Sequence, residues 1–199
     1  MLTDTQMIEL SRKMDVPLVG CFFKDTLPKL EYNKSYVVNL QDEYNEDGTL
    51  NRGSHWTCFQ IQKYPNGVVE GLYFDPTGVA PPKDVINKYK QLTKKEHFPY
   101  NTKDIQSALN NACGWYCLAY LHYINAFSHR SKNLYDDADT FLSFFDDLNK
   151  SADFKKNEYI LKQFFQPKDP KLRKEIDVFG DGIDRIVEKD NERIDLTKV

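Results

Sequence analysis

The chain has 199 residues, of which 40% are hydrophobic and 14% aromatic, and a net charge of −3. This length predicts one domain, 1–199, with a sizeable core, and the aromatic content argues against a disordered chain. The slight negative charge gives no global attraction to nucleic acid or to anionic membranes. Because no apolar run reaches about 18 residues, no membrane-spanning segment is expected.

The start of the chain and its cysteines predict the cellular compartment. Residues 1–13 carry acids and polar residues where a secretory signal would need an apolar stretch. We therefore expect a protein that is not secreted and keeps its thiols free in a reducing compartment. Each cysteine is then either a small core residue or a reactive one. The four show no regular spacing: Cys21, Cys58, Cys113 and Cys117.

The first part of the chain predicts one helix followed by strands. Thr3 and Gln6 have the spacing of a helix-capping box. Tyr64-Pro65-Asn66-Gly67 is a strong turn between two apolar runs, which predicts a β-hairpin in which Lys63 pairs with Val68. The expected elements are a helix to about Met14, a mostly irregular stretch over 15–34, and strands over 35–41, 55–63 and 68–75.

The rest of the chain predicts helices. Residues 113–127 are apolar almost all the way round, so a helix there belongs in the middle of a domain. Shorter helices are expected over 83–92, 137–149 and 154–165, and the tail from 167 is highly charged. Six lysines suggest a solvated helix face in preference to a nucleic-acid-binding patch. They are Lys83, Lys88, Lys90, Lys94, Lys95 and Lys103.

Cys113 has the setting of a thiol nucleophile, because it stands where the central helix begins. The positive end of a helix dipole favours thiolate over thiol. Gly114 follows it, and a glycine leaves room for a substrate backbone to approach closely. The alternative is that Cys113 is a small core residue, as isolated buried cysteines commonly are.

His55 and Asp75 fall at the open end of the predicted hairpin. His55 begins its first strand and Asp75 ends its second, so the acid could orient the imidazole and stabilise its charged form. In the expected register His55 lies opposite Pro76, one residue from Asp75, and a slip of one residue would bring both onto one face. A surface histidine near an unrelated aspartate is the alternative.

Together these segments resemble the adenovirus-type maturation proteases, or adenain-like cysteine proteases. The resemblance covers most of 16–130 and depends on the order of its pieces. They are Leu18-Val19-Gly20-Cys21-Phe22-Phe23-Lys24-Asp25, Gly53-Ser54-His55-Trp56, Tyr73-Phe74-Asp75-Pro76-Thr77-Gly78, Gln106, Ala112-Cys113-Gly114-Trp115-Tyr116-Cys117 and Leu121-His122.

The resemblance implies an α+β, papain-like fold with a central buried helix on a mixed β-sheet. It implies a catalytic core over 1–130 and a mainly helical part over 131–199. Cys113 would be the nucleophile, His55 the base, Asp75 the orienting acid and Gln106 the oxyanion-hole donor. Trp56, beside the histidine, and Gly114 would bind substrate. The adenovirus enzymes use Glu where Asp75 stands, whereas Asp is common there in the wider clan, which moves the source from adenovirus to a virophage or another double-stranded DNA virus.

The resemblance also implies a biological role. Such enzymes cut viral capsid or core precursors at glycine-containing sites during virion maturation, in the virion and in the host-cell cytoplasm or virus factory. We expect a monomer that needs no cofactor. The family's activation by a peptide or by DNA is left open and not favoured, since the net charge is −3.

Other functions fit parts of the sequence. An isopeptidase specific for ubiquitin-like modifiers would use the same residues, whereas a binding module on this fold would have lost one of them. A zinc site at Cys113, Cys117 and His122 is disfavoured, because five residues turn a helix by about 140°. A calcium loop at Asp177, Asp181, Gly182 and Glu188 is disfavoured, because Phe179 occupies a ligand position.

Overall fold

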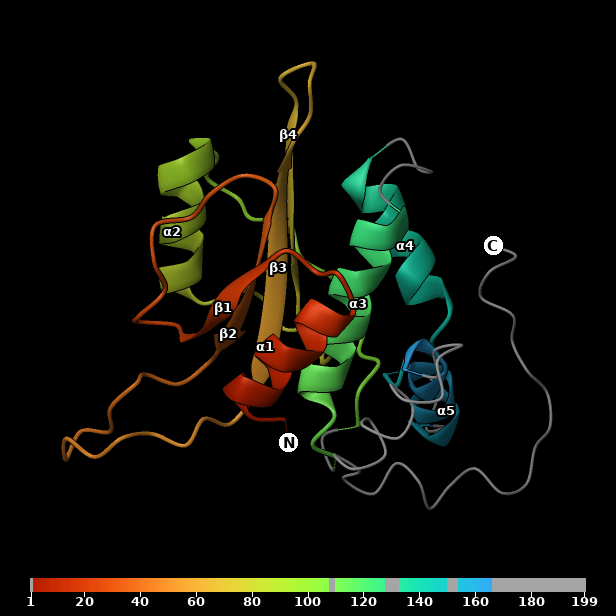
Figure 1. Ribbon diagram of the computed structural model, residues 1–199, viewed down its shortest axis with the longest axis horizontal. Coiled ribbons are helices and arrows are strands. Elements are labelled where there is room, and N and C mark those ends of the chain that lie inside the picture. The colour runs from red at the N-terminus through yellow and green to blue at the C-terminus, as the bar shows by residue number, and fades with distance from the viewer. Residues whose placement is uncertain (1, 108–109, 128–132, 150–153, 166–199) are drawn as a thin grey trace.

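A four-stranded mixed sheet forms the centre of the computed structural model, with helices on both of its faces (Figure 1). The structure describes residues 2–107, 110–127, 133–149 and 154–165. This is an α+β arrangement with a buried central helix, as expected from the sequence. The strands, in spatial order, are β1 (Leu18–Phe23), β2 (Lys34–Asn39), β3 (Trp56–Lys63) and β4 (Val69–Phe74).

The hairpin β3–β4 confirms the two predicted strands but not their register. Lys63 pairs with Val69 instead of Val68. The difference arises at the turn, where the Tyr64 N–H donates to the Val68 carbonyl at 2.9 Å and Gly67 adopts a φ of 84°. A residue in this left-handed conformation closes a three-residue hairpin loop, and glycine adopts it at low cost. The shift by one residue moves every pair along the hairpin.

The edge strand β1 corrects the expectation that 15–34 is mostly irregular. Five of its six residues pair in parallel with β2, and the register shifts at Val19, between Leu18 and Gly20. Parallel pairing depends on a neighbour elsewhere in the chain, and Pro17 and Gly20 obscured the apolar run around them. The antiparallel pairs β2–β3 and β3–β4 complete a mixed sheet.

Two hydrophobic clusters lie on opposite faces of the sheet. On one face, Val85 and Tyr89 of α2 (Lys83–Thr93) pack with Tyr36, Phe59 and other buried strand residues. On the other face lie α1 (Asp4–Lys13) and α3 (Cys113–Phe127). The capping box predicted for α1 is present: Thr3 Oγ1 accepts from the Gln6 N–H, and the Gln6 side chain accepts from the Thr3 N–H.

Helix α3 is the centre of the larger cluster. Its apolar residues from Cys113 to Ile124 are buried, which explains a sequence with no polar face. Phe74 of β4 stacks on Tyr120 of α3 with ring centroids 4.4 Å apart, and Phe141 meets both rings edge-on. Such contacts fix the depth of α3 on the sheet.

The C-terminal helices cover the outer side of α3 (Figure 1). Helix α5 (Phe154–Phe164) matches its prediction, but α4 (Leu134–Ser143) begins three residues before the expected 137. Asn133 is its N-cap, and its side chain accepts from the Asp136 N–H. The tail from 167, including the calcium-loop positions, lies outside the described residues. Among the described helices, none has the length and hydropathy needed to cross a membrane.

Candidate active site

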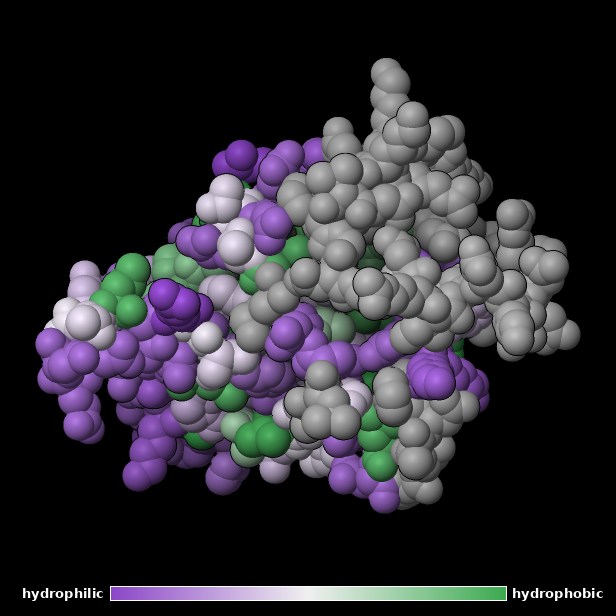
Figure 2. Space-filling view, turned by 90° about the horizontal axis from the view of Figure 1, so that it is seen from below, coloured by the Kyte–Doolittle hydropathy of each residue, from purple (hydrophilic) through white to green (hydrophobic). Residues whose placement is uncertain are grey.

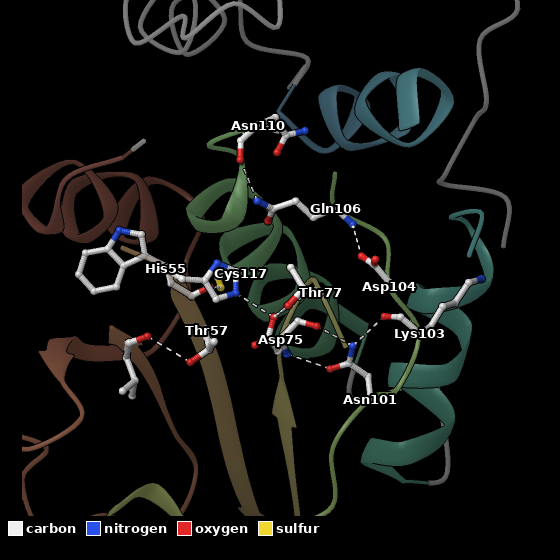
Figure 3. A network of polar contacts seen from close by, with 12 residues as sticks. His55, Thr57, Asp75, Thr77, Asn101, Lys103, Asp104, Gln106, Asn110 and Cys117 are labelled. Atoms are coloured by element: carbon white, nitrogen blue, oxygen red, sulfur yellow. Dashed lines mark hydrogen bonds and ion pairs between the residues drawn. The ribbon is translucent and has the colours of Figure 1, made fainter. Parts of the chain in front are cut away.

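The hairpin brings His55 and Asp75 into contact at its open end. His55 directly precedes β3 and Asp75 directly follows β4, so the paired strands place both side chains at the same end of the sheet. His55 Nε2 lies 2.8 Å from Asp75 Oδ1 (Figure 3). Asp75 is fully buried, whereas the His55 side chain is 19% exposed. The aspartate can therefore hold the ring while one edge of the imidazole stays accessible.

Cys113 lies against the same imidazole. It is the first residue of α3, is almost completely buried, and lies close enough to the imidazole to raise the pKa of His55. Because Nε2 binds Asp75, Nδ1 is the nitrogen left for the thiol. The structure thus joins the predicted nucleophile, base and orienting acid in one chain of contacts.

The electrostatics favour a protonated His55. Burial opposes the charged imidazolium, but the hydrogen bonds to Asp75 and Cys113 and the negative charge of both groups outweigh it, which raises the His55 pKa to about 9. The site can therefore hold an imidazolium near neutral pH.

The other three cysteines have environments that favour the thiol. Burial, followed by the charge of Asp4, raises the Cys21 pKa to about 12. Burial also raises the pKa values of Cys58 and Cys117, whose sulfurs point to the backbone carbonyls of Cys117 and Trp56. Nucleophilic attack requires thiolate, so these three positions are poor nucleophiles.

Two residues missed by the sequence reasoning hold Asp75 in place. Its Oδ1 accepts from the Thr77 N–H at 2.8 Å and from the Thr77 hydroxyl at 2.7 Å, besides its contact with His55. Asn101 is buried and clamps the Asp75 backbone: its Oδ1 accepts from the Asp75 N–H, and its Nδ2 donates to the Asp75 carbonyl. The Asp-x-Thr spacing was a usable signal for Thr77, whereas Asn101 had none.

Gln106 lies buried in the irregular segment that leads to α3. Its Nε2 donates to the Asn110 carbonyl at 3.2 Å (Figure 3). Its backbone N–H donates to the Pro76 carbonyl at 3.1 Å. Asn110 in turn accepts the Ala112 N–H on its side-chain oxygen, next to Cys113. One hydrogen of the Gln106 amide is thus used within the protein, which leaves the second one to donate.

Trp56 and Gly114 both contact the N-terminal segment. The Trp56 indole is buried and donates to the Leu2 carbonyl at 3.0 Å. A Cβ atom on Gly114 would lie 3.2 Å from Leu2 Cβ and 3.1 Å from Met7 Sδ. The space beside Gly114 is therefore filled by the chain itself on that side. Substrate binding by these two residues stays a prediction.

The described residues do not place Cys113, Cys117 and His122 as ligands of one zinc ion. His122 Nδ1 lies 2.9 Å from the Met14 carbonyl, and Cys117 is completely buried against Trp56. Within the ranges that the structure describes, no three His, Cys, Asp or Glu side chains are grouped as metal ligands would be.

Seen from the end at which β3 and α3 begin, the coloured surface is mostly hydrophilic, with small separate hydrophobic patches (Figure 2). Exposed apolar side chains on the described part of the chain include Tyr44 and Leu50, in the loop that precedes His55. These two residues face each other across an isolated antiparallel bridge. The loop thus carries apolar side chains within the stretch between β2 and His55.

Comparisons with known proteins give distant structural neighbours. No protein-family profile and no curated protein matches the chain. The crystal structure of HopZ1a in complex with IP6 is 11% identical with a TM-score of 0.38, over 68% of this chain and 46% of that one. The ASFV pS273R protease structure is 19% identical with a TM-score of 0.31, over 56% and 43%. The chain thus spans under half the length of either neighbour.

Proposed function

We propose that this protein is a cysteine-type endopeptidase, a thiol protease that hydrolyses peptide bonds. The observation that carries the proposal is the chain of contacts from Cys113 through His55 to Asp75. A nucleophile, a base within hydrogen-bonding reach and a buried acid that orients the base are the arrangement that nucleophilic acyl transfer requires. All three side chains stand on regular elements or directly beside them.

The mechanism follows from this geometry. Cys113 Sγ attacks the scissile carbonyl, and the thiol proton resides on His55. Gln106 Nε2 and the Cys113 backbone N–H donate to the oxyanion. The C–N bond then breaks as His55 gives its proton to the leaving amine. Water, deprotonated by His55, attacks the thioester, releasing the acid and restoring the thiol.

The biological role rests on the sequence resemblance to adenain-like proteases. The motif pieces, in the family's order, support cleavage of viral capsid or core precursors at glycine-containing bonds. The proposed places of action are the virion and the cytoplasm or virus factory of an infected cell. An enzyme specific for isopeptide bonds to ubiquitin-like modifiers would need the same residues, and it is an outcome of the substrate test below.

The first test is alkylation by chloroacetamide at pH 6, mapped by peptide mass. We expect fast labelling confined to Cys113, because its thiol lies beside a protonated His55 at this pH, whereas burial raises the pKa of the other three thiols. The His55→Ala variant should lose this labelling, whereas the exposed control His97→Ala should keep it. Equal, slow labelling of all four cysteines would refute the proposal.

The second test addresses the substrate. Gly-Gly peptides and Gly-Gly isopeptide-linked conjugates are offered to the wild type and to Cys113→Ala. Cleavage of the linear peptides by the wild type alone supports the endopeptidase. Cleavage confined to the conjugates would replace it with the isopeptidase.

A further inference from the structure

Gln106 belongs to an irregular strap, residues 101–107, that depends on other parts of the chain for its shape. The strap connects the sheet region to the start of α3 and has no helical or strand pairing of its own beyond a single bridge nearby. Its Lys103 ammonium donates to the Leu142 carbonyl at 2.8 Å and also to the Phe145 carbonyl, at the end of α4. The Leu148 N–H donates to the Asp104 carbonyl at 2.8 Å. Residues 142–148 therefore hold one side of the strap through hydrogen bonds.

Asn157 of α5 holds the peptide bond that carries Gln106. Its Nδ2 donates to the Ile105 carbonyl at 3.0 Å, across 52 positions in the sequence. The other side of the same peptide bond, the Gln106 N–H, meets the Pro76 carbonyl. Asn157 is completely buried, and its remaining contacts tie it to the Asp146 backbone at 2.7 and 2.8 Å. Its amide has one orientation that satisfies all these partners.

Glu158, the next residue of α5, holds the partner of the Gln106 side chain. It is buried, and its Oε1 accepts from Asn110 Nδ2. The Asn110 carbonyl accepts from Gln106 Nε2, and the Asn110 side-chain oxygen accepts from the Ala112 N–H. Glu158 thus fixes the residue that orients the Gln106 amide, whereas Asn157 fixes its backbone.

We propose that Asn157 and Glu158 are positioning residues for the oxyanion donor Gln106, so that α5 is part of the catalytic apparatus. This inference rests on the proposed function, because it needs Gln106 to act on an oxyanion. It gives the C-terminal helices a role beyond covering the central helix. A donor acts well only if its direction is set before the charge develops, and both α5 residues serve this preorganisation.

The experiment compares two reactions of Cys113 on the full-length protein. Chloroacetamide alkylates the sulfur by displacing chloride, without an oxyanion. p-Nitrophenyl acetate acetylates it through a tetrahedral oxyanion: the new S–C bond forms, the ester C–O bond breaks, nitrophenolate leaves, and the thiol proton passes to His55. The ratio of acetylation to alkylation rates, both measured by intact mass, isolates oxyanion stabilisation without a known substrate.

We expect Gln106→Ala to lower this ratio roughly a hundredfold, and Asn157→Ala to lower it roughly tenfold. Added to Gln106→Ala, the Asn157→Ala change should cost nothing more, because the two act through one group. Asn157→Asp keeps the acceptor for Asp146 but not the donor for Ile105, so it should match Asn157→Ala. Lys155→Ala, an exposed change in the same helix, is the matched control.

Glu158 provides a second route if Asn157→Ala fails to fold. Glu158→Gln keeps an oxygen that can accept from Asn110 and should retain most of the ratio, whereas Glu158→Ala should lose several-fold. An unchanged ratio in folded Asn157→Asp and Glu158→Ala would overturn the inference, as would additive losses with Gln106→Ala. Slow alkylation in the wild type would instead count against the proposed function itself.

Discussion

The β3–β4 hairpin and the 101–107 strap each supply part of the site, but they are held in different ways. His55 and Asp75 are brought together by neighbouring strands only 20 positions apart, through the backbone pairing of the hairpin. Gln106 lies in a segment whose shape depends on side chains 48 and 52 positions away from their partners. The proposed acid–base pair is thus positioned by local backbone pairing, whereas the proposed oxyanion donor is positioned by tertiary contacts.

This difference has a physical consequence for mutation. Many backbone pairs of the hairpin together position His55, so one surface substitution on the strands should move it little. The strap relies on a few buried amide and carboxylate groups, each of which leaves an unsatisfied partner when it is removed. The two halves should therefore be separable by substitution, and four predictions sharpen or break this comparison.

The largest expected effect on activity comes from removing the Cys113 sulfur, next to which both parts of the site lie. Cys113→Ala should abolish acyl transfer, because burial raises the pKa of the other three cysteine thiols and leaves them poor nucleophiles. The thermal midpoint should change little, since alanine fills most of the thiol's buried volume. Hydrolysis of p-nitrophenyl acetate, with the Cys21→Ala variant as control, is the measurement. Residual His55-dependent turnover in Cys113→Ala would mean that a different nucleophile operates.

The clamp on Asp75 links the hairpin to the strap, because Asn101 is the first strap residue. Asn101→Ala leaves the buried Asp75 N–H unpaired, while the Asp75 carbonyl keeps the Gly78 N–H, and should cost about 1–3 kcal/mol of unfolding free energy. It should also slow Cys113 alkylation at pH 8, since Asp75 loses its fixed position. Urea unfolding and labelling rates check both effects. Asn87→Ala, on the exposed face of α2, is the control, and equal stability of the two variants would contradict the clamp.

The raised pKa of His55 predicts how stability depends on pH. The folded state binds the proton more tightly than the unfolded state, whose histidine titrates near pH 6.5. The resulting stabilisation is therefore complete below about pH 6.5 and is lost as pH rises through about 9. The difference in unfolding free energy between the wild type and His55→Gln should shrink by about 2 kcal/mol between pH 6 and pH 10. This figure is reduced from the full value of the pKa shift because His55 is partly exposed. A pH-independent difference in urea unfolding, or an equal change in His97→Gln, would contradict it.

The smallest effect concerns the N-terminal segment. Trp56→Phe removes the indole N–H that binds the Leu2 carbonyl and should cost about 1 kcal/mol. Trp115→Phe is matched in chemistry, because the Trp115 N–H is buried without a hydrogen-bond partner among the described residues. Thermal unfolding should thus show the larger loss for Trp56→Phe. The reverse order would assign the stabilisation to aromatic packing.

The parts of the fold that follow from local signals were predictable from the sequence. The capping box of α1, the strong turn of the hairpin and the all-round apolar pattern of α3 each set their element with short-range chemistry. The register of the hairpin was not, because it depends on whether Tyr64 pairs with Val68 around a left-handed Gly67. The start of α4 was missed for a similar reason: a single Asn133 cap outweighed the apolar periodicity.

The site divides along the same line. The motif pieces around His55, Asp75 and Cys113 contained enough order and spacing to indicate a site, and the structure joins those three side chains. Asn101, Asn157 and Glu158 are single polar residues with no local pattern, and their importance appears only when burial and partners are known. A buried amide is inconspicuous in a sequence because Asn is common in loops and on helix surfaces.

The contact of Leu2 with Trp56 and Gly114 has a practical consequence for any preparation of this protein. Trp56 follows His55 and Gly114 follows Cys113. The residues next to the proposed base and the proposed nucleophile therefore both pack against Leu2. A sample from which a contaminating protease has removed Leu2 would keep His55, Asp75 and Cys113, yet those molecules would lack the residue against which both neighbours pack. Active-site titration would then count fewer active molecules than absorbance counts protein molecules. Intact-mass measurement of the sample would reveal the missing residues.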